Sequence, residues 1–262
     1  MDIIQFLQQN LILFLLTVVR IGSIFVSAPI FSSRNIPARI KVLFAIFISL
    51  VVFPSVLQTY KGAIPDELLP FIICVLTEFL IGVTIGFIME IFFAIIQVAG
   101  QMLDTQVGFG IVNVVDPQSG TQIPLLGNFI QVIFTIVFLA SDMHHLFLIA
   151  LIDSFEVLPF NHATLQPISA IFVLNLFTEM FLMGFKIAMP MMMTTLLVDI
   201  SMGMLARTMP QMNVFVVGIP LKLAVGIFML GIFLPTYIYI LKVAYRGVPD
   251  NIYKILSIFA GG

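Results

Sequence analysis

Long apolar segments separated by short polar ones make up most of the chain. The apolar runs cover residues 11–31, 40–57, 68–100, 123–152, 168–206 and 212–241. A helix needs about 20 apolar residues to cross the hydrocarbon core of a membrane. Six membrane-spanning helices fit this pattern most simply. The sequence therefore predicts an all-α polytopic membrane protein.

Two of these runs are longer than one membrane crossing requires. As one helix, residues 68–100 would be about 50 Å long at ~1.5 Å per residue, against a hydrocarbon core of ~30 Å. No proline lies between Phe71 and Gly100, so we expect a straight overlong helix there. The run 168–206 is longer still and contains Pro190, which can break a helix. Such helices must tilt, break or continue into a protein environment.

The segment 100–124 interrupts the helical pattern. It contains Gly108-Phe109-Gly110, Asp116-Pro117 and Gly120, with valines between them. This composition is too apolar for a solvated loop and too rich in glycine for a lipid-facing helix. Irregular backbone at membrane depth is tolerated only where it is buried in protein or lines an aqueous cavity. We predict a re-entrant loop that closes or lines a pore, with a simple extramembrane loop as the alternative.

The composition supports the membrane class. Charged residues make up 9% of the chain and hydrophobic residues 61%, whereas soluble domains carry about 25% charged residues. The formal net charge of -2 gives no basic excess for binding nucleic acid. The first basic residue is Arg20, inside the first apolar run, so we expect a retained span and no cleaved signal peptide. The single cysteine, Cys74, excludes an intrachain disulfide and a cysteine-based metal site.

Charges inside apolar runs are costly and need a reason. The charges in question are Glu78, Glu90, Glu179, Lys186 and Asp199. The first two are twelve residues apart and project about 120° apart on a helix, so they form no paired-carboxylate site by themselves. Glu179 and Lys186 are seven residues apart, which places them on the same side of a helix, two turns apart. A proton or ion path is one interpretation; pairing between helices or subunits is the one we favour.

A glycine pair and a methionine cluster point to helix packing. Gly82 and Gly86 form a small-x-x-x-small pattern that lets another helix approach closely. Methionines gather around Pro190 and continue to Met212. They suit surfaces that adapt to partners, although ordinary core filling explains them equally well.

Enzyme motifs are absent from the sequence. It has no phosphate-binding glycine loop and no His-Glu-x-x-His. Asp142-Met143-His144-His145 is the only histidine cluster. Adjacent histidines on a helix point about 100° apart, so we interpret this cluster as a polar turn between two helices. We expect no catalytic residue, no metal and no cofactor.

Several short motifs together resemble the FliR family of flagellar export-gate proteins, and the counterparts in virulence type III secretion systems are similar. The motifs are Ala28-Pro29-Ile30-Phe31, Ile36-Pro37-Ala38-Arg39-Ile40-Lys41, Leu80-Ile81-Gly82-x-x-Ile85-Gly86-Phe87, Gly100-Gln101 through Val115-Asp116-Pro117, and Arg207-x-x-Pro210-Gln211-x-Asn213-x-Phe215-x-x-Gly218-Ile219-Pro220-Leu221-Lys222. They run through nearly the whole chain in order.

The resemblance implies an architecture and a set of partners. Residues 1–167 would be a FliP-like helical part that includes a plug loop at 105–122, and residues 168–262 a FliQ-like helical hairpin with a C-terminal tail. One copy would assemble with FliP-like and FliQ-like subunits, beside FlhB-like and FlhA-like proteins. The assembly would sit in the bacterial inner membrane, in contact with lipid at the flagellar basal body, and pass unfolded substrates.

The resemblance also assigns roles to residues. The channel plug would comprise Gly108, Phe109, Gly110, Val112, Val114, Asp116 and Gly120. The hairpin turn that contacts a FlhB-like partner would comprise Arg207, Gln211, Asn213 and Lys222. Three alternatives stay open: a virulence secretion gate, an ion-coupled secondary transporter, and a membrane scaffold without a pore.

Overall fold

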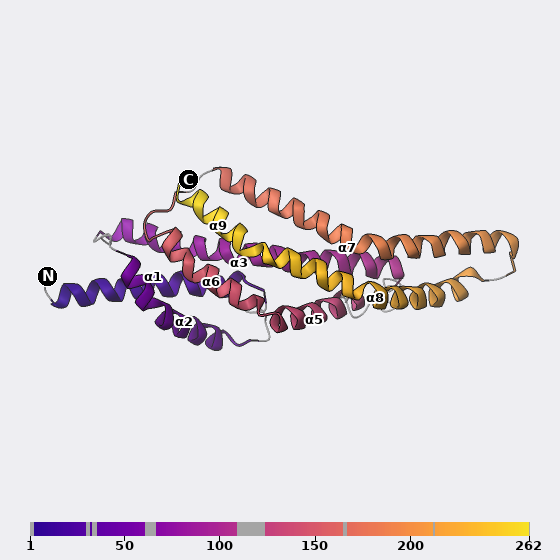
Figure 1. Cartoon of the computed structure of the whole chain (residues 1–262), viewed down its shortest axis with the longest axis horizontal. Coiled ribbons are helices and arrows are strands. Elements are labelled where there is room, and N and C mark those ends of the chain that lie inside the picture. The colour runs from indigo at the N-terminus through magenta and orange to yellow at the C-terminus, as the bar shows by residue number, and fades with distance from the viewer. Residues whose placement is uncertain are drawn as a thin grey trace. The chain divides into compact units, whose positions relative to one another are not determined.

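The computed structural model describes residues 3–29, 32, 36–60, 67–108, 124–164, 167–211 and 213–261. Within these ranges the chain is helical and contains no strand. The helices are α1 (Ile3–Ser27), α2 (Ala38–Thr59), α3 (Leu68–Val107), α5 (Leu125–Ala140), α6 (Met143–Val157), α7 (Pro167–Thr208), α8 (Val214–Arg246) and α9 (Val248–Phe259), as Figure 1 shows.

The predicted all-α polytopic membrane fold is confirmed. Five stretches of the described chain are long and apolar enough to cross a membrane: Gln9–Ser27, Ala38–Thr59, Leu68–Val107, Ile168–Thr208 and Val216–Phe259. Helices α5 and α6 add a sixth if they are counted as one broken span. The apolar run 123–152 is thus two helices, which the turn at Ser141 and Asp142 separates.

The first overlong run forms one continuous helix. Helix α3 has 40 residues, which corresponds to about 60 Å at ~1.5 Å per residue. It continues to Val107, beyond the predicted end at Gly100. The beginning of the segment that the sequence marks as irregular, including Thr105, is therefore helical.

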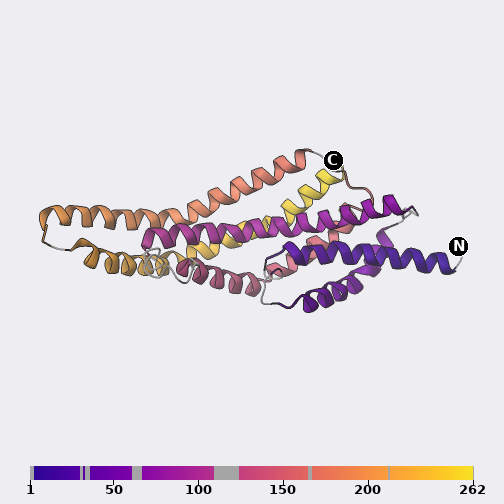
Figure 2. The same cartoon turned by 180° about the vertical axis from the view of Figure 1, so that it is seen from behind.

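The second overlong run is also continuous. Helix α7 has 42 residues and continues through Pro190, so the break that this proline could have caused does not occur. Both views show that α7 bends part-way along its length (Figure 1, Figure 2). A proline inside a helix removes one backbone donor and commonly produces such a kink.

The C-terminal tail contains a helix that the sequence reading missed. The buried side chains of α9 are Val248, Ile252, Ile255, Leu256 and Phe259, spaced as on one helix face. Helix α9 packs against α6, where the Tyr253 hydroxyl donates a hydrogen bond to Asp153 Oδ2 at 2.5 Å.

The chain forms two compact units, each assembled from segments that are distant in sequence. Unit 1 comprises Met1–Phe92, Met143–Leu176 and Arg246–Gly262, and unit 2 comprises Phe93–Asp142 and Phe177–Tyr245. In unit 1, α1 and α2 lie side by side in both views (Figure 1, Figure 2). The predicted division of the chain at residue 167 into a FliP-like and a FliQ-like part is based on resemblance to other proteins. These two units do not test it, so it stays a prediction.

The core of unit 2 is aromatic. The Phe93 ring meets those of Phe134 and Phe138 edge-on, with centroids 5.4 Å and 5.6 Å apart. The Tyr245 ring lies 5.0 Å from that of Phe134. These contacts join the second half of α3 to α5 and to the end of α8. They hold α5 beside α3.

Candidate functional site

A carboxylate from α3 caps the first turn of α5. Asp104 is 5% exposed, and its two carboxylate oxygens accept hydrogen bonds from the backbone N–H groups of Leu126 and Gly127 at 2.8 Å and 2.9 Å. The residue at the N-cap position, Pro124, has no side-chain group to do this. The first N–H groups of a helix lack partners within it and favour a negative charge. Asp104 of the neighbouring helix α3 supplies the hydrogen-bond acceptors and the negative charge.

The two helices cross closely beside this cap. A Cβ atom on Gly100 would overlap the Cα atom of Gly127, and a Cβ on Gly127 would lie 3.2 Å from Asp104 Oδ2. Position 100 therefore requires glycine for this separation, whereas a side chain at position 127 would fit only if its neighbours shifted slightly. The cap and the crossing together hold the last turns of α3 against the first turn of α5.

Helix α3 ends at Val107, directly before Gly108, the first of the predicted plug residues. Gly108 has φ of +98°, which L side chains rarely adopt, and its N–H donates to the Asp104 carbonyl at 3.3 Å. A left-handed glycine directly after the last helical residue is a common helix end. The other predicted plug residues, Phe109, Gly110, Val112, Val114, Asp116 and Gly120, lie outside the described residues.

One predicted buried charge has a partner that sequence reasoning missed. Glu78 is fully buried and forms an ion pair with Arg20 of α1 at 2.5 Å. Arg20 also donates to the carbonyl oxygens of Ser154 and Leu158, both at 3.0 Å. Its guanidinium lies over the Phe155 ring, 4.4 Å from the centroid. Arg20 therefore ties α1 to α3 and to the end of α6.

The predicted glycine pair lies in the same region. A Cβ on Gly82 would overlap the Arg20 carbonyl oxygen and Ser23 Oγ, and a Cβ on Gly86 would overlap Ser27 Oγ. The structure thus packs α1 directly against this face of α3. Close contact of the two helices is what brings Arg20 within reach of Glu78.

The other predicted charges are placed differently. Glu90 is half-buried, whereas Glu179 and Lys186 are exposed on this chain. None of the three makes a hydrogen bond or ion pair with the part of the chain that the structure describes. This chain alone therefore does not bury the charges of α7.

The hairpin turn lies between the end of α7 at Thr208 and the start of α8 at Val214. Arg207, Gln211 and Asn213 are exposed there. Lys222 is different, because it donates to Asp199 Oδ2 of α7 at 2.7 Å. This pair links the two helices of the hairpin and accounts for Asp199, another of the unexplained charges.

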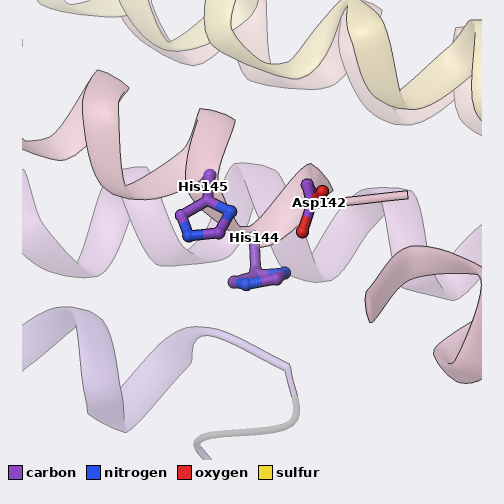
Figure 3. Close-up of side chains that lie close together, drawn as sticks. All are labelled: Asp142, His144 and His145. Carbon is purple, nitrogen blue, oxygen red and sulfur yellow. The ribbon is translucent and has the colours of Figure 1, made fainter. Parts of the chain in front are cut away.

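Among the described residues, one group of three side chains could hold a metal ion. It lies near the start of α6 (Figure 3). The potential ligand atoms of Asp142, His144 and His145 lie within 4.8 Å of one another. The expected divergence of the histidines is wrong, since their ring centroids are 4.3 Å apart. Ligands around Zn²⁺ are only about 3.3 Å apart, and a helix N-terminus disfavours cations. We assign no metal here.

Comparison with known proteins identifies the family. The family model described as bacterial export proteins, family 1, matches residues 11–247. The chain belongs to this family. Its relatives named flagellar biosynthetic protein FliR include one from Bacillus subtilis (strain 168), 37% identical over 83% of this chain and 84% of the relative. Those from Aquifex aeolicus (strain VF5) and Escherichia coli (strain K12) are 30% and 29% identical, over 87% and 82% of both chains. The predicted FliR resemblance is confirmed.

Proposed function

We propose that this chain is a core subunit of the flagellar type III protein export gate, and that it forms and seals the channel through which unfolded flagellar substrates cross the inner membrane. This membrane protein is a component of the flagellar export apparatus, because the relatives that match more than four-fifths of the chain are flagellar biosynthetic proteins. The channel-forming and sealing roles go beyond that and are the proposal.

The observation that carries the sealing role is the cap at Asp104. Residues 109–123 connect α3 to α5, and the glycines and Asp116-Pro117 in this stretch do not suit a membrane helix. The Asp104 carboxylate fixes the helix that follows this stretch to the helix that precedes it. A connection whose two ends are anchored can close a pore without displacing the helices that carry it. This supports a plug built on a rigid base.

The proposal assigns partners as well. One copy of the chain assembles with FliP-like and FliQ-like subunits next to FlhB-like and FlhA-like proteins, and no bond is made or broken by this chain. The exposed residues Arg207, Gln211 and Asn213 of the hairpin turn, together with Lys222 of α8, contact the FlhB-like protein. A photo-crosslinker at Gln211 that captures no such protein in the assembled gate contradicts this contact.

The plug assignment is tested by deleting residues 110–116 and measuring leakage of ions or small solutes in cells that express the assembled gate. We expect a leak, because the deletion removes the seal and leaves the Asp104 cap intact. The matched control replaces the same residues by a scrambled sequence of equal length. A deletion variant that assembles normally and does not leak would overturn the plug, and normal export with the scrambled segment would favour a scaffold without a pore.

The runner-up functions are less well supported. A virulence secretion gate loses support because the relatives carry flagellar names. An ion-coupled transporter loses one of its candidate carboxylates, since Glu78 Oε2 is paired with Arg20. Substrate-dependent uptake by the purified chain alone would revive it.

A further inference from the structure

A cavity of about 490 Å³ lies between three helices of unit 1. Helix α3 lines it with residues from Thr77 to Thr84, and α7 lines it with its first turns, up to Leu174. Helix α9 contributes Ile255 and Phe259. The lining positions recur every three or four residues along each helix, so each helix turns one face toward the cavity.

The cavity extends from the interior of unit 1 to its surface. Ile81, Ile255 and Phe259 are at most 5% exposed and form its inner wall. Leu80 of α3 and Leu174 of α7 are 45% and 66% exposed and form its rim. The cavity is therefore open on one side, and a flexible molecule can enter it from outside the protein.

The walls of the cavity offer almost nothing polar. None of the described residues that line it is charged. The hydroxyls of Thr77 and Thr84 donate hydrogen bonds to the carbonyl oxygens of Ile73 and Leu80, each at 2.8 Å, so they are satisfied within α3. A water molecule in a cavity needs about two to four polar partners, which so apolar a lining does not supply. The walls therefore suit an apolar occupant.

The size of the cavity suits a hydrocarbon chain. A cavity of about 150 Å³ lined by Leu, Ile and Phe stays dry and binds benzene. The cavity in unit 1 is roughly three times as large, which places it within the range of ~300–1,000 Å³ that is usual for ligand sites. A space of this size that is left unfilled forfeits dispersion contacts along its whole lining. A long, flexible apolar molecule restores these contacts.

The position of the cavity points to a membrane lipid. Its three helices belong to the apolar stretches Leu68–Val107, Ile168–Thr208 and Val216–Phe259, each long enough to cross a membrane. The lining residues of α7 lie near the beginning of its stretch, and those of α9 lie at the end of theirs. Membrane spans begin and end near the lipid headgroups. None of the described lining residues is basic, so the site binds no carboxylate and the polar end of the molecule stays outside.

Helix α9 supplies the wall that completes the cavity. The backbone N–H and the hydroxyl of Thr164 donate to the Phe259 carbonyl oxygen at 2.8 Å and 3.1 Å, and Tyr253 donates to Asp153 of α6. The family match ends at residue 247, and α9 begins at Val248, so this wall lies beyond the matched residues. We propose that the cavity holds one acyl chain of a membrane phospholipid, which fills the space between α3, α7 and α9 while its headgroup remains outside.

Photolabelling tests the site on the full chain in vesicles of phosphatidylethanolamine and phosphatidylglycerol. The probe is a phosphatidylglycerol with a diazirine in one acyl chain, and the labelled positions are mapped by mass spectrometry. We expect label on Ile255 and Phe259, because the bilayer around the protein does not reach these buried side chains. Ile252 is the control, since it is as buried in α9 as Ile255 but does not line the cavity, and it should stay unlabelled.

Narrowing the cavity provides a second test. Val173→Phe adds a ring to the α7 wall, whereas Ile171→Phe adds one outside the lining, about 200° around the helix. The Kd of each delipidated chain in detergent for the same phosphatidylglycerol is measured by native mass spectrometry. We expect Val173→Phe to raise the Kd about tenfold, because the ring displaces roughly two methylene groups of the acyl chain. Ile171→Phe should bind as the wild type does.

Three results would overturn the proposal. Label confined to exposed residues such as Leu80 and Leu174, or equal Kd values for the two phenylalanine variants, would show that no acyl chain enters the cavity. A palmitate probe that labels Ile255 as strongly as the phospholipid would replace the phospholipid by a free fatty acid. A photo-crosslinking residue at Val173 that captures a neighbouring subunit in the assembled gate would show that protein fills the cavity.

Discussion

Asp104 shows how a single side chain can replace a missing helix cap. The start of α5 offers Pro124 at the N-cap position, and proline has no side-chain acceptor for the N–H groups of Leu126 and Gly127. The Asp104 carboxylate reaches both from another helix. Because the acceptor belongs to α3, the cap also fixes the position of α5.

Replacing this carboxylate should weaken unit 2. We expect Asp104→Ala to lower the free energy of unfolding by about 1–2 kcal/mol, since it removes a helix cap and leaves buried N–H groups unpaired. The corresponding fall in Tm is roughly 2–8 °C for a chain of this size. The measurement is the thermal unfolding of the purified chain in detergent.

The control for Asp104 is Asp199→Ala, which removes a more exposed carboxylate paired with Lys222. An exposed ion pair contributes only about 0–1 kcal/mol, so this variant should unfold closer to the wild-type Tm. Equal Tm values for the two variants would contradict the importance of the cap.

The sequence pattern points to Arg20 and to Glu78 separately, but not to the ion pair that they form. Both stand out as charges in apolar runs, yet they are 58 residues apart in sequence. A buried charge is tolerated when it is paired and hydrogen-bonded. Arg20 meets this condition through Glu78, the carbonyl groups of Ser154 and Leu158 at the end of α6, and an aromatic face. A proton path through Glu78 therefore loses support.

At the scale of helices, the contact between α1 and α3 depends on glycine. Gly82 lies where any side chain would overlap the backbone of α1 at Arg20. Small residues allow such close approach, and the dispersion contacts that follow are a main source of helix association in membranes. The same closeness positions Arg20 to pair with Glu78.

Adding one methyl group at this contact should separate the helices. We expect Gly82→Ala to lower the free energy of unfolding by about 1–3 kcal/mol through overpacking. The matched control is Gly22→Ala in α1, where a Cβ would meet no atom within 4 Å. That variant should be neutral or more stable by up to about 1 kcal/mol, because alanine suits a helix interior better than glycine.

Thermal unfolding of both variants in the same detergent provides the comparison. A Gly82→Ala variant as stable as Gly22→Ala would show that α1 does not lie against α3 as described.

At the scale of the whole molecule, the chain leaves large apolar surfaces uncovered. Within unit 2, α7 and α8 expose Leu197, Met204, Phe228 and Ile232. Surfaces of this kind mark contacts with lipid or with other proteins. The exposed charges Glu179 and Lys186 on α7 favour protein over lipid for the part of the surface on which they lie.

The proposed assembly predicts a defined complex. Native mass spectrometry of the tagged chain, co-expressed with its FliP-like and FliQ-like subunits, should give a hetero-oligomer that holds one copy of this chain. The chain expressed alone is the reference sample. A stable monomer or homodimer that ignores those subunits would argue against the gate and in favour of a transporter.

The sequence determined the class of the protein and the location of its long apolar helices, but not the short helix α9 or the division of residues 123–152 into α5 and α6. Apolar runs of the right length fix membrane helices because lipid offers no backbone partners, and this physics is local to each run. The hairpin turn after Thr208 follows from the same reasoning. The motifs that resemble the FliR family are also a property of the sequence alone.

Only the tertiary structure decided which residues meet. The continuation of α3 to Val107 depends on α5, whose N–H groups bind Asp104 and whose Gly127 fits against Gly100. The pairing of Arg20 with Glu78 depends on three helices from separate parts of the chain. Periodicity describes one helix at a time, whereas these contacts arise from the packing of several. The outward face of α7 is likewise known only because α3 covers the other one.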